Sequence, residues 1–193
     1  MNYVPYALYL AAVATLPSCA TVRLTPDESA ALKALRRYIE LDRSGARLDS
    51  NRYHSMAALS AWADEPGWDA FVVVSGAAIS RPVERDGKVV ARVRYDVVGA
   101  MEGDSFMPVD ALPPDTAERL AVGAPIEFVL VSTSDGWKIE SPQVPPHAGF
   151  GAARAVAAEL GAEGALRDLD DAEYLAKLKG ARAGHCNCER LDF

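Results

Sequence analysis

Two cysteines and a histidine lie close together near the C-terminal end of the chain, as His185-Cys186-Asn187-Cys188. Thiolates and imidazole can bind zinc or softer metals, but three ligands so close together leave a tetrahedral site incomplete. A disulfide between Cys186 and Cys188 would close a small, strained ring, and strained disulfides are often redox-active. A functionless pair of cysteines, a metal site and a redox pair all stay open, and we predict no metal and no cofactor.

Asp96 is the clearest candidate for acid–base chemistry. It lies in a predicted strand beside Arg92 and Arg94, where neighbouring charges could tune it as a general base. The three side chains fall on the same face of the strand, however, because residues two apart point the same way. The pattern favours a polar strand face with cross-strand charge pairs, and we assign no catalytic residue.

Aromatic residues supply candidates for a ligand pocket. They are Tyr38, Tyr53, Trp62, Trp68 and Tyr95. Such side chains join a large apolar surface to a polar tip, which suits a flat or apolar ligand but also suits packing at the boundary of a core. Core packing is therefore the alternative, with Trp62 and Trp68 on either side of a turn at residues 64–67.

Composition and missing motifs weaken several common functions. The net charge is −7, whereas a nucleic-acid-binding protein needs a clustered basic surface. The sequence also lacks the His-Glu-x-x-His, Gly-x-Ser-x-Gly and Gly-x-x-x-x-Gly-Lys patterns of zinc proteases, α/β-hydrolases and phosphate-binding loops. We therefore expect no nucleic-acid partner and no common hydrolase or nucleotide-binding activity.

The N-terminal segment has the character of an export signal. No charged side chain occurs from Met1 to Val22, and the residues from Tyr3 to Leu16 are almost all apolar. This stretch is shorter than the roughly 20 residues that cross a bilayer as a helix. Its length instead matches the apolar region of a signal peptide.

The residues that follow, Leu16-Pro17-Ser18-Cys19-Ala20, resemble the lipobox of bacterial lipoproteins. That resemblance implies cleavage before Cys19, lipid on its thiol and a domain held at the membrane by acyl chains. It also implies the cell envelope, facing the periplasm, and Ala20 slightly favours the outer membrane. A plain secretory signal or a buried N-terminal segment are the alternatives.

Helical patterns flank the middle of the chain. Thr25-Pro26-Asp27-Glu28 predicts a capped helix over 26–43, stopped by Gly45. A second helix is expected from Asp49 or Ser50 to the Pro-Gly turn at 66–67. After residue 148 the chain is rich in alanine, which predicts a helix broken by glycines and a last helix near 171–179.

Between these helices the sequence predicts strands. The expected strands lie at 71–79, 89–98, 126–132 and 137–140, with a loop and a short helix near 116–120 between the second and the third. Asp86-Gly87 and Ser134-Asp135-Gly136 are hairpin-type turns. Helices segregated from a mainly antiparallel sheet predict an α+β domain, with N-terminal helices packed on a curved sheet and further C-terminal helices.

This order, closing on Gly136-Trp137-Lys138-Ile139, resembles the cone-shaped nuclear transport factor two-like superfamily, which hosts enzymes and silent binding modules alike. The resemblance implies a cavity between helices and sheet. The expected parts are a signal peptide (1–18), a tether (19–25), the cone-like domain (26–147), a helical extension (148–180) and a flexible tail (181–193).

We expect an envelope-tethered, non-enzymatic binding or interaction module, whose partner is a small apolar ligand or an envelope protein. An isomerase or dehydratase with an acid in the cavity, and a metal- or redox-handling protein using Cys186 and Cys188, are the alternatives.

Overall fold

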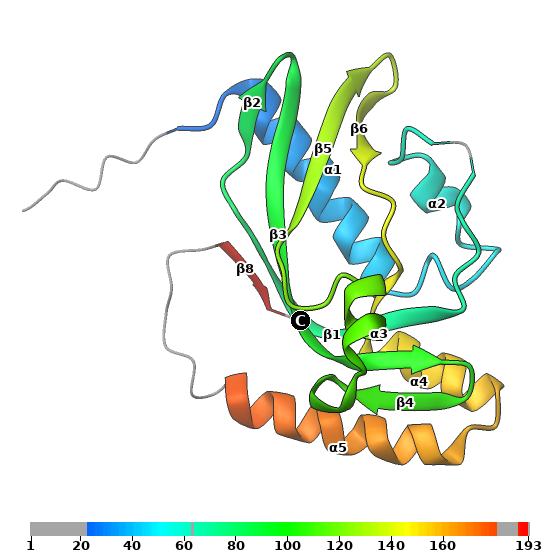
Figure 1. Cartoon of the computed structure of the whole chain (residues 1–193). Helices are drawn as coiled ribbons and strands as arrows, with labels where there is room; N and C mark the ends of the chain where they lie inside the picture. The colour runs from blue at the N-terminus through cyan, green and yellow to red at the C-terminus, as the bar shows by residue number, and fades with distance from the viewer. Residues whose placement is uncertain (1–22, 63, 181–188, 193) are drawn as a thin grey trace, which may run out of the picture.

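The computed structural model describes residues 23–62, 64–180 and 189–192, and the predicted leader and Cys19 lie outside this range. The described helices are α1 (Pro26–Arg43), α2 (His54–Ala57), α3 (Pro114–Arg119), α4 (Phe150–Glu159) and α5 (Glu163–Gly180). The strands are β1 (Ala70–Ile79), β2 (Val83–Arg85), β3 (Lys88–Glu102), β4 (Ser105–Pro108), β5 (Ile126–Thr133), β6 (Gly136–Ser141), β7 (His147–Gly149) and β8 (Glu189–Asp192). Helices segregated from one sheet make an α+β fold, as predicted (Figure 1).

The sheet is curved and mainly antiparallel. Its central path runs β6-β5-β3-β1-β7, while β2 and β4 pair with β3 and β8 pairs with β1. Only the β1–β7 pairing is parallel among these strands. The register of β1 against β3 shifts between Val73 and Gly76, and irregularities of this kind bend a strand.

Helix α1 begins and ends where the sequence predicts. Thr25 accepts a hydrogen bond from the Glu28 backbone N–H, and the Glu28 side chain accepts one from the Thr25 N–H, so the capping box is complete. After the helix, Gly45 adopts a φ of +82°, which glycine tolerates without steric cost.

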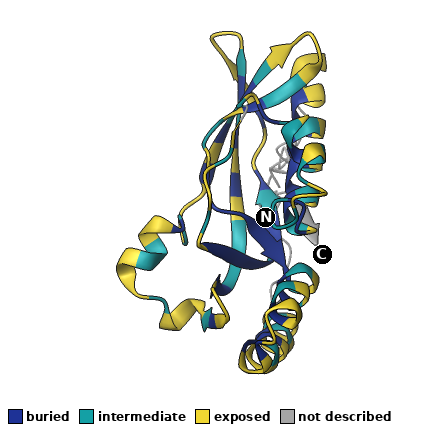
Figure 2. Ribbon diagram, turned by 90° about the vertical axis from the view of Figure 1, so that its right-hand side faces the viewer, coloured by how far each residue is buried: buried dark blue, intermediate teal, exposed yellow. Residues whose placement is uncertain are grey.

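One face of α1 is buried against the concave side of the sheet. Leu32, Leu35 and Ile39 supply the apolar surface predicted from their spacing, and they pack with Phe128, Leu130 and Ile139 from the strands. Figure 2 shows α1 lying along the sheet with its exposed side turned outward. Burial of this stripe, at about 25 cal/mol per Å² of apolar surface, holds the helix on the sheet.

The second predicted helix is mostly absent, and only the single turn α2 forms. The backbone of the following residues pairs with β6 instead: Ile139 N–H donates to the Leu59 carbonyl, and Ala61 N–H donates to the Ile139 carbonyl, both at 2.8 Å. These bonds require extended backbone, so tertiary pairing overrides the helical spacing of Tyr53, Met56 and Trp62. Of these three residues only Met56 is fully buried.

Two helices follow the sheet, as predicted, but α5 begins earlier than the expected residue 171. Gly161, with a φ of +67°, separates α4 from α5, whereas Gly164 lies inside α5. The buried face of α5 is made of two alanines and one leucine, Ala165, Leu169 and Ala172, and Ala162 is buried just before the helix. Small residues allow α5 to approach α4 and the sheet closely, which outweighs the low helix propensity of one glycine.

Strand β2 precedes the predicted turn at Asp86-Gly87, but three other short strands were not predicted. Strand β4 forms within the expected loop, β7 follows the Pro-rich segment at 142–146, and β8 lies within the expected flexible tail. Each is only three or four residues long and has too little alternation to be recognised. In the described part of the chain, helices that are both long and apolar enough to cross a membrane are not found.

Candidate functional site

A cluster of buried polar side chains lies between α1 and the sheet. We call it the polar cluster; its members are Tyr38, Asp42, Arg47, Tyr95 and His147. Tyr38 and Asp42 come from the last two turns of α1, Arg47 from the turn after it, Tyr95 from the middle of β3 and His147 from the start of β7. The packing of α1 on the sheet thus brings together three segments of the chain: residues 38–47, the middle of β3 and the start of β7.

Asp42 carries a carboxylate in the interior. Its side chain is 1% exposed, and Oδ2 accepts the His147 backbone N–H at 3.0 Å and lies 3.4 Å from Arg47 Nη1. Burial raises the pKa of Asp42 to about 6, because the opposing effects of Arg47 and the His147 N–H only partly offset desolvation. A buried carboxyl group with such a pKa can change its protonation state near neutral pH.

Arg47 connects three parts of the chain. Besides Asp42, its guanidinium forms an ion pair through Nη2 with Glu65 and donates from Nη2 to the Val144 carbonyl at 2.6 Å. The Arg47 side chain is 1% exposed. Two carboxylates therefore share one buried cation, and removal of that cation would leave both carboxylates uncompensated.

His147 and Tyr95 form a stacked pair. Their ring centroids are 4.1 Å apart, with 22° between the ring planes. Burial and the nearby charge of Arg47 lower the pKa of His147 to about 3, so the imidazole is neutral at pH 7. Burial and the Asp42 carboxylate raise the pKa of Tyr95. Tyr95 therefore keeps its proton at neutral pH.

Several polar atoms in and beside the polar cluster are buried and have no hydrogen-bond partner among the described residues. They are Tyr38 Oη, Asp42 Oδ1, Arg47 Nε, Tyr53 Oη, Tyr95 Oη and His147 Nδ1. Tyr38 also stays protonated, since burial and Asp42 raise its pKa. Buried polar groups in native proteins are normally paired with protein, water or ligand atoms. Such a set of donors and acceptors suits a polar partner.

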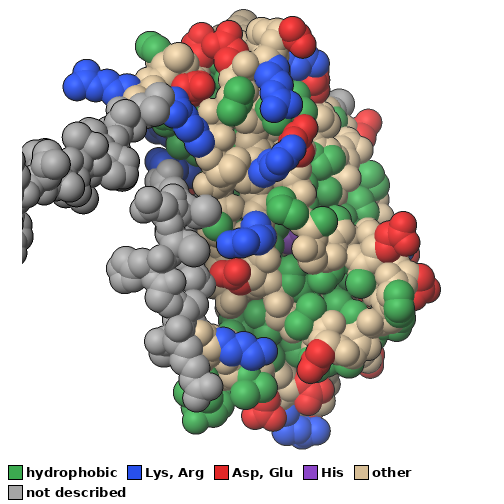
Figure 3. All heavy atoms as spheres, turned by 60° about the vertical axis from the view of Figure 1, so that its left-hand side comes forward, with side chains coloured by type: hydrophobic (Ala, Val, Ile, Leu, Met, Phe, Trp, Pro, Cys, Tyr) green, Lys and Arg blue, Asp and Glu red, His purple; other side chains and the backbone are tan. Residues whose placement is uncertain are grey.

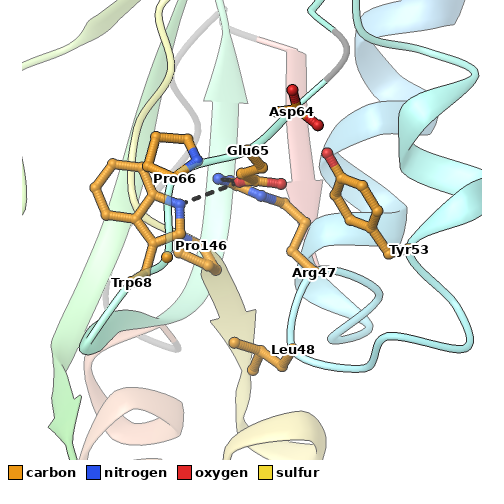
Figure 4. A pocket seen from close by; sticks show the side chains of 9 residues that line it. Arg47, Leu48, Tyr53, Asp64, Glu65, Pro66, Trp68 and Pro146 are labelled. Carbon is orange, nitrogen blue, oxygen red and sulfur yellow. Dashed lines mark hydrogen bonds and ion pairs between the residues drawn. The ribbon is translucent and has the colours of Figure 1, made fainter.

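A pocket of about 520 Å³ opens beside the polar cluster. It is lined by Arg47, Leu48, Tyr53, Asp64, Glu65, Pro66, Gly67, Trp68 and Pro146. Figure 4 shows the Trp68 ring on one side of Arg47 and the Tyr53 ring on the other. Trp68 Nε1 donates to Glu65 Oε1 at 3.2 Å. Arg47 belongs to both the pocket and the polar cluster, so it joins the two.

The structure divides the aromatic residues that the sequence singled out. Tyr53 and Trp68 line the pocket, whereas Tyr38 and Tyr95 lie deeper and contribute unpartnered hydroxyl groups near Asp42. Trp62 does not reach the pocket and packs partly buried against the apolar core under α1. The predicted set therefore mixes pocket, polar-cluster and core positions.

Asp96 is not in the polar cluster. It is half-buried and lies on the face of β3 opposite to the neighbouring Tyr95. Arg92 pairs with Glu127 across the β3–β5 register, with both side chains substantially exposed. That cross-strand pair fits the interpretation of a polar strand face.

The metal and redox interpretation concerns His185, Cys186 and Cys188, which lie outside the described residues. Within the part of the chain that the structure describes, no group of three or more metal-ligating side chains is found.

On the face drawn in Figure 3, the described basic and acidic side chains are interspersed, without a continuous basic patch.

Sequence reasoning missed Asp42, Arg47, Glu65 and His147. A signal existed for Asp42 alone, because it continues the helical spacing of Leu35 and Tyr38–Ile39 and so falls on the buried face of α1. The other three lie in irregular backbone or in a strand of three residues, where no periodicity predicts which way a side chain points.

Comparison with protein-family models, with curated proteins and with solved structures found no match. The protein is therefore described by its own structure, as an α+β domain with an aromatic pocket beside the buried polar cluster.

Proposed function

We propose that the protein is an envelope-tethered lipoprotein that binds a small ligand in the pocket of Tyr53, Arg47 and Trp68. The observation that carries this proposal is the combination of an open pocket, two aromatic walls and a fixed, buried cation. Ligand sites commonly combine apolar and aromatic walls with a few well-placed polar groups. The lipobox-like residues around Cys19 supply the tether.

Ligand binding is tested on full-length protein purified in a mild detergent, using three fragments of matched size and different charge. Phenylacetate, phenylacetamide and phenethylammonium are compared by ligand-observed NMR. We expect at least one to bind, and we expect Trp68→Ala to weaken that binding tenfold or more. Tyr174→Ala, at an exposed aromatic residue on α5, is the control. Lack of binding by all three, or equal sensitivity to both variants, would contradict the proposal.

The tether is tested separately by mass spectrometry of the mature N-terminus from the native host. We expect a chain that begins at Cys19 and carries the mass of acyl chains, and we expect Cys19→Ala to release the protein from the membrane fraction. A mature chain that retains residues 1–18 would contradict this part of the proposal.

An acid–base enzyme is a second candidate, and Asp42 is the observation that favours it. A buried carboxyl group with a raised pKa, an unpartnered oxygen and protonated tyrosines close by has the properties of a general acid or base, and Arg47 connects it to the pocket. Asp42 thus takes the role that the sequence suggested for Asp96.

Deuterium uptake from D₂O into a panel of enolisable ketones tests this candidate. If the protein is such an enzyme, catalysed exchange will fall at least a hundredfold in Asp42→Asn and will stay within twofold in the control Asp96→Asn. Exchange that is no faster than in buffer, or that both variants retain, would discard it.

A further inference from the structure

We propose that Glu65 is a built-in occupant of a carboxylate-binding site, and that the natural ligand carries a carboxylate that replaces it beside Arg47 and Trp68. This inference rests on the proposed binding function and names the chemistry of its ligand.

Arg47, the cation that would bind the carboxylate, is held in place by contacts that do not involve Glu65. Arg47 is also held by Asp42 at Nη1 and by the Val144 carbonyl at Nη2. Its 1% exposed side chain is fixed by α1 and by the segment before β7. A guanidinium that is immobilised in advance loses little entropy when it binds a carboxylate.

Glu65, by contrast, lies in a segment of irregular backbone. The described residues around Glu65, from 64 to 69, form no regular helix or strand, and the adjacent Asp64, Pro66 and Gly67 are exposed. The Glu65 side chain is 12% exposed and lies at the wall of the pocket. It can therefore leave Arg47 with little disturbance of the core.

Glu65 uses only part of what the site offers. Its Oε1 accepts from Arg47 Nη2 and from Trp68 Nε1, whereas Arg47 Nε is buried and has no partner in the described part of the chain. Nε and Nη2 form one edge of the guanidinium, and that edge matches both oxygens of a carboxylate. A free carboxylate can therefore satisfy a donor that Glu65 leaves unpaired.

The pocket also fits the rest of such a ligand. Next to the Arg47–Glu65 pair, Leu48, Pro66, Pro146 and the ring of Trp68 supply apolar walls (Figure 4). The ligand class is thus a small carboxylic acid with a flat or apolar body, for which phenylacetate is a probe.

The test compares dissociation constants of phenylacetate and phenylacetamide for full-length wild type, Glu65→Ala and Asp64→Ala. Both substitutions remove one negative charge from the pocket, but only Glu65→Ala removes the carboxylate that pairs with Arg47. We expect phenylacetate to bind Glu65→Ala at least tenfold more tightly than wild type, with less than a threefold gain in Asp64→Ala and no gain for the amide. Adding Trp68→Phe, which removes the indole N–H, should reverse part of the gain.

A thermal readout accompanies binding. Glu65→Ala leaves Arg47 less well paired, so millimolar phenylacetate should raise its melting temperature more than it raises that of wild type. If Glu65→Ala does not fold, Glu65→Gln serves in its place with the same expectations.

The outcomes separate this inference from the proposed function. Suppose that a fragment binds wild type and that Trp68→Ala weakens this binding, but that phenylacetate binds Glu65→Ala no more tightly than wild type. The carboxylate assignment is then overturned, and the proposal of ligand binding in the pocket stands. Equal gains in the Asp64 and Glu65 variants, or for acid and amide, also overturn it. If no fragment binds any variant, both proposals fail.

Discussion

The backbone N–H of His147 donates a 3.0 Å hydrogen bond to the Asp42 carboxylate, which ties the start of β7 to the last turn of α1. Neither residue is accessible to bulk solvent. Burial raises the pKa of the Asp42 carboxyl group and lowers the pKa of the His147 imidazole. The two groups therefore change the stability of the fold in opposite directions as pH changes.

Between about pH 4 and 6, the contributions of Asp42 and His147 to the pH dependence of the free energy of unfolding should nearly cancel. The folded pKa of Asp42 is raised from 3.8 to about 6, so its contribution to stability falls as pH rises through this range. The folded pKa of His147 is lowered from 6.5 to about 3, so its contribution rises over the same range. Each slope is limited to about 1.4 kcal/mol per pH unit.

Urea unfolding of two variants at pH 4, 5 and 6 separates these contributions. Asp42→Asn should lose stability as pH falls, because His147 then acts alone. His147→Phe keeps the backbone N–H that binds Asp42, and it should gain stability as pH falls. Identical pH slopes in the two variants would contradict the assignment.

Loss of the shared cation should be costly. Arg47→Met leaves Asp42 and Glu65 buried without a counter-charge, and such a change typically lowers the free energy of unfolding by about 3–5 kcal/mol. The triple variant with Asp42→Asn and Glu65→Gln should recover part of this loss. Arg92→Met, at an exposed pair with Glu127, should cost at most about 1 kcal/mol. Chemical denaturation measures all three, and a similar cost at Arg47 and Arg92 would disagree with a buried network.

Gly99 should not tolerate a side chain. A Cβ there would lie 2.3 Å from the Met107 carbonyl oxygen and 2.6 Å from Phe106 Cζ. We expect Gly99→Ala to destabilise the protein by about 1–3 kcal/mol through displacement of β4. Gly151→Ala in α4, where the described residues place nothing within 4 Å of the added atom, should be neutral or stabilise by up to about 1 kcal/mol. Melting temperatures of both variants provide the comparison.

The capping box of α1 should contribute measurably to stability. Thr25→Ala removes the side chain that accepts the Glu28 N–H, and substitutions of this kind cost about 1 kcal/mol. Thr25→Ser keeps the acceptor and should stay close to wild type when unfolding is followed by circular dichroism. Equal losses in the two variants would mean that the cap is not what Thr25 contributes.

The sequence is enough to predict those parts of the fold that local rules determine. Thr25 and Pro26 mark the start of α1, and the alternation of Val89, Ala91 and Val93 marks the buried face of β3, as the structure has them. The helix expected after Ser50 is where prediction failed, because hydrogen bonds to Ile139, far away in the sequence, decide the conformation there.

The candidate site was less predictable than the fold. Aromatic residue types pointed to Tyr53 and Trp68, but nothing local distinguishes these two from Trp62, which is partly buried against the core. Arg47 and His147 acquire their roles only through long-range contacts, since their partners lie as far as 97 and 105 residues away.

Other segments of the chain pair with the outer sides of β6 and β1. Residues 59–61 pair with β6, while β7 and β8 together pair with most of the outer side of β1. Open strand edges are templates on which protein chains aggregate. Here the protein's own segments occupy those positions, so removal of the residues after Gly180 would uncover Gly76–Ile79 and favour self-association of the purified protein.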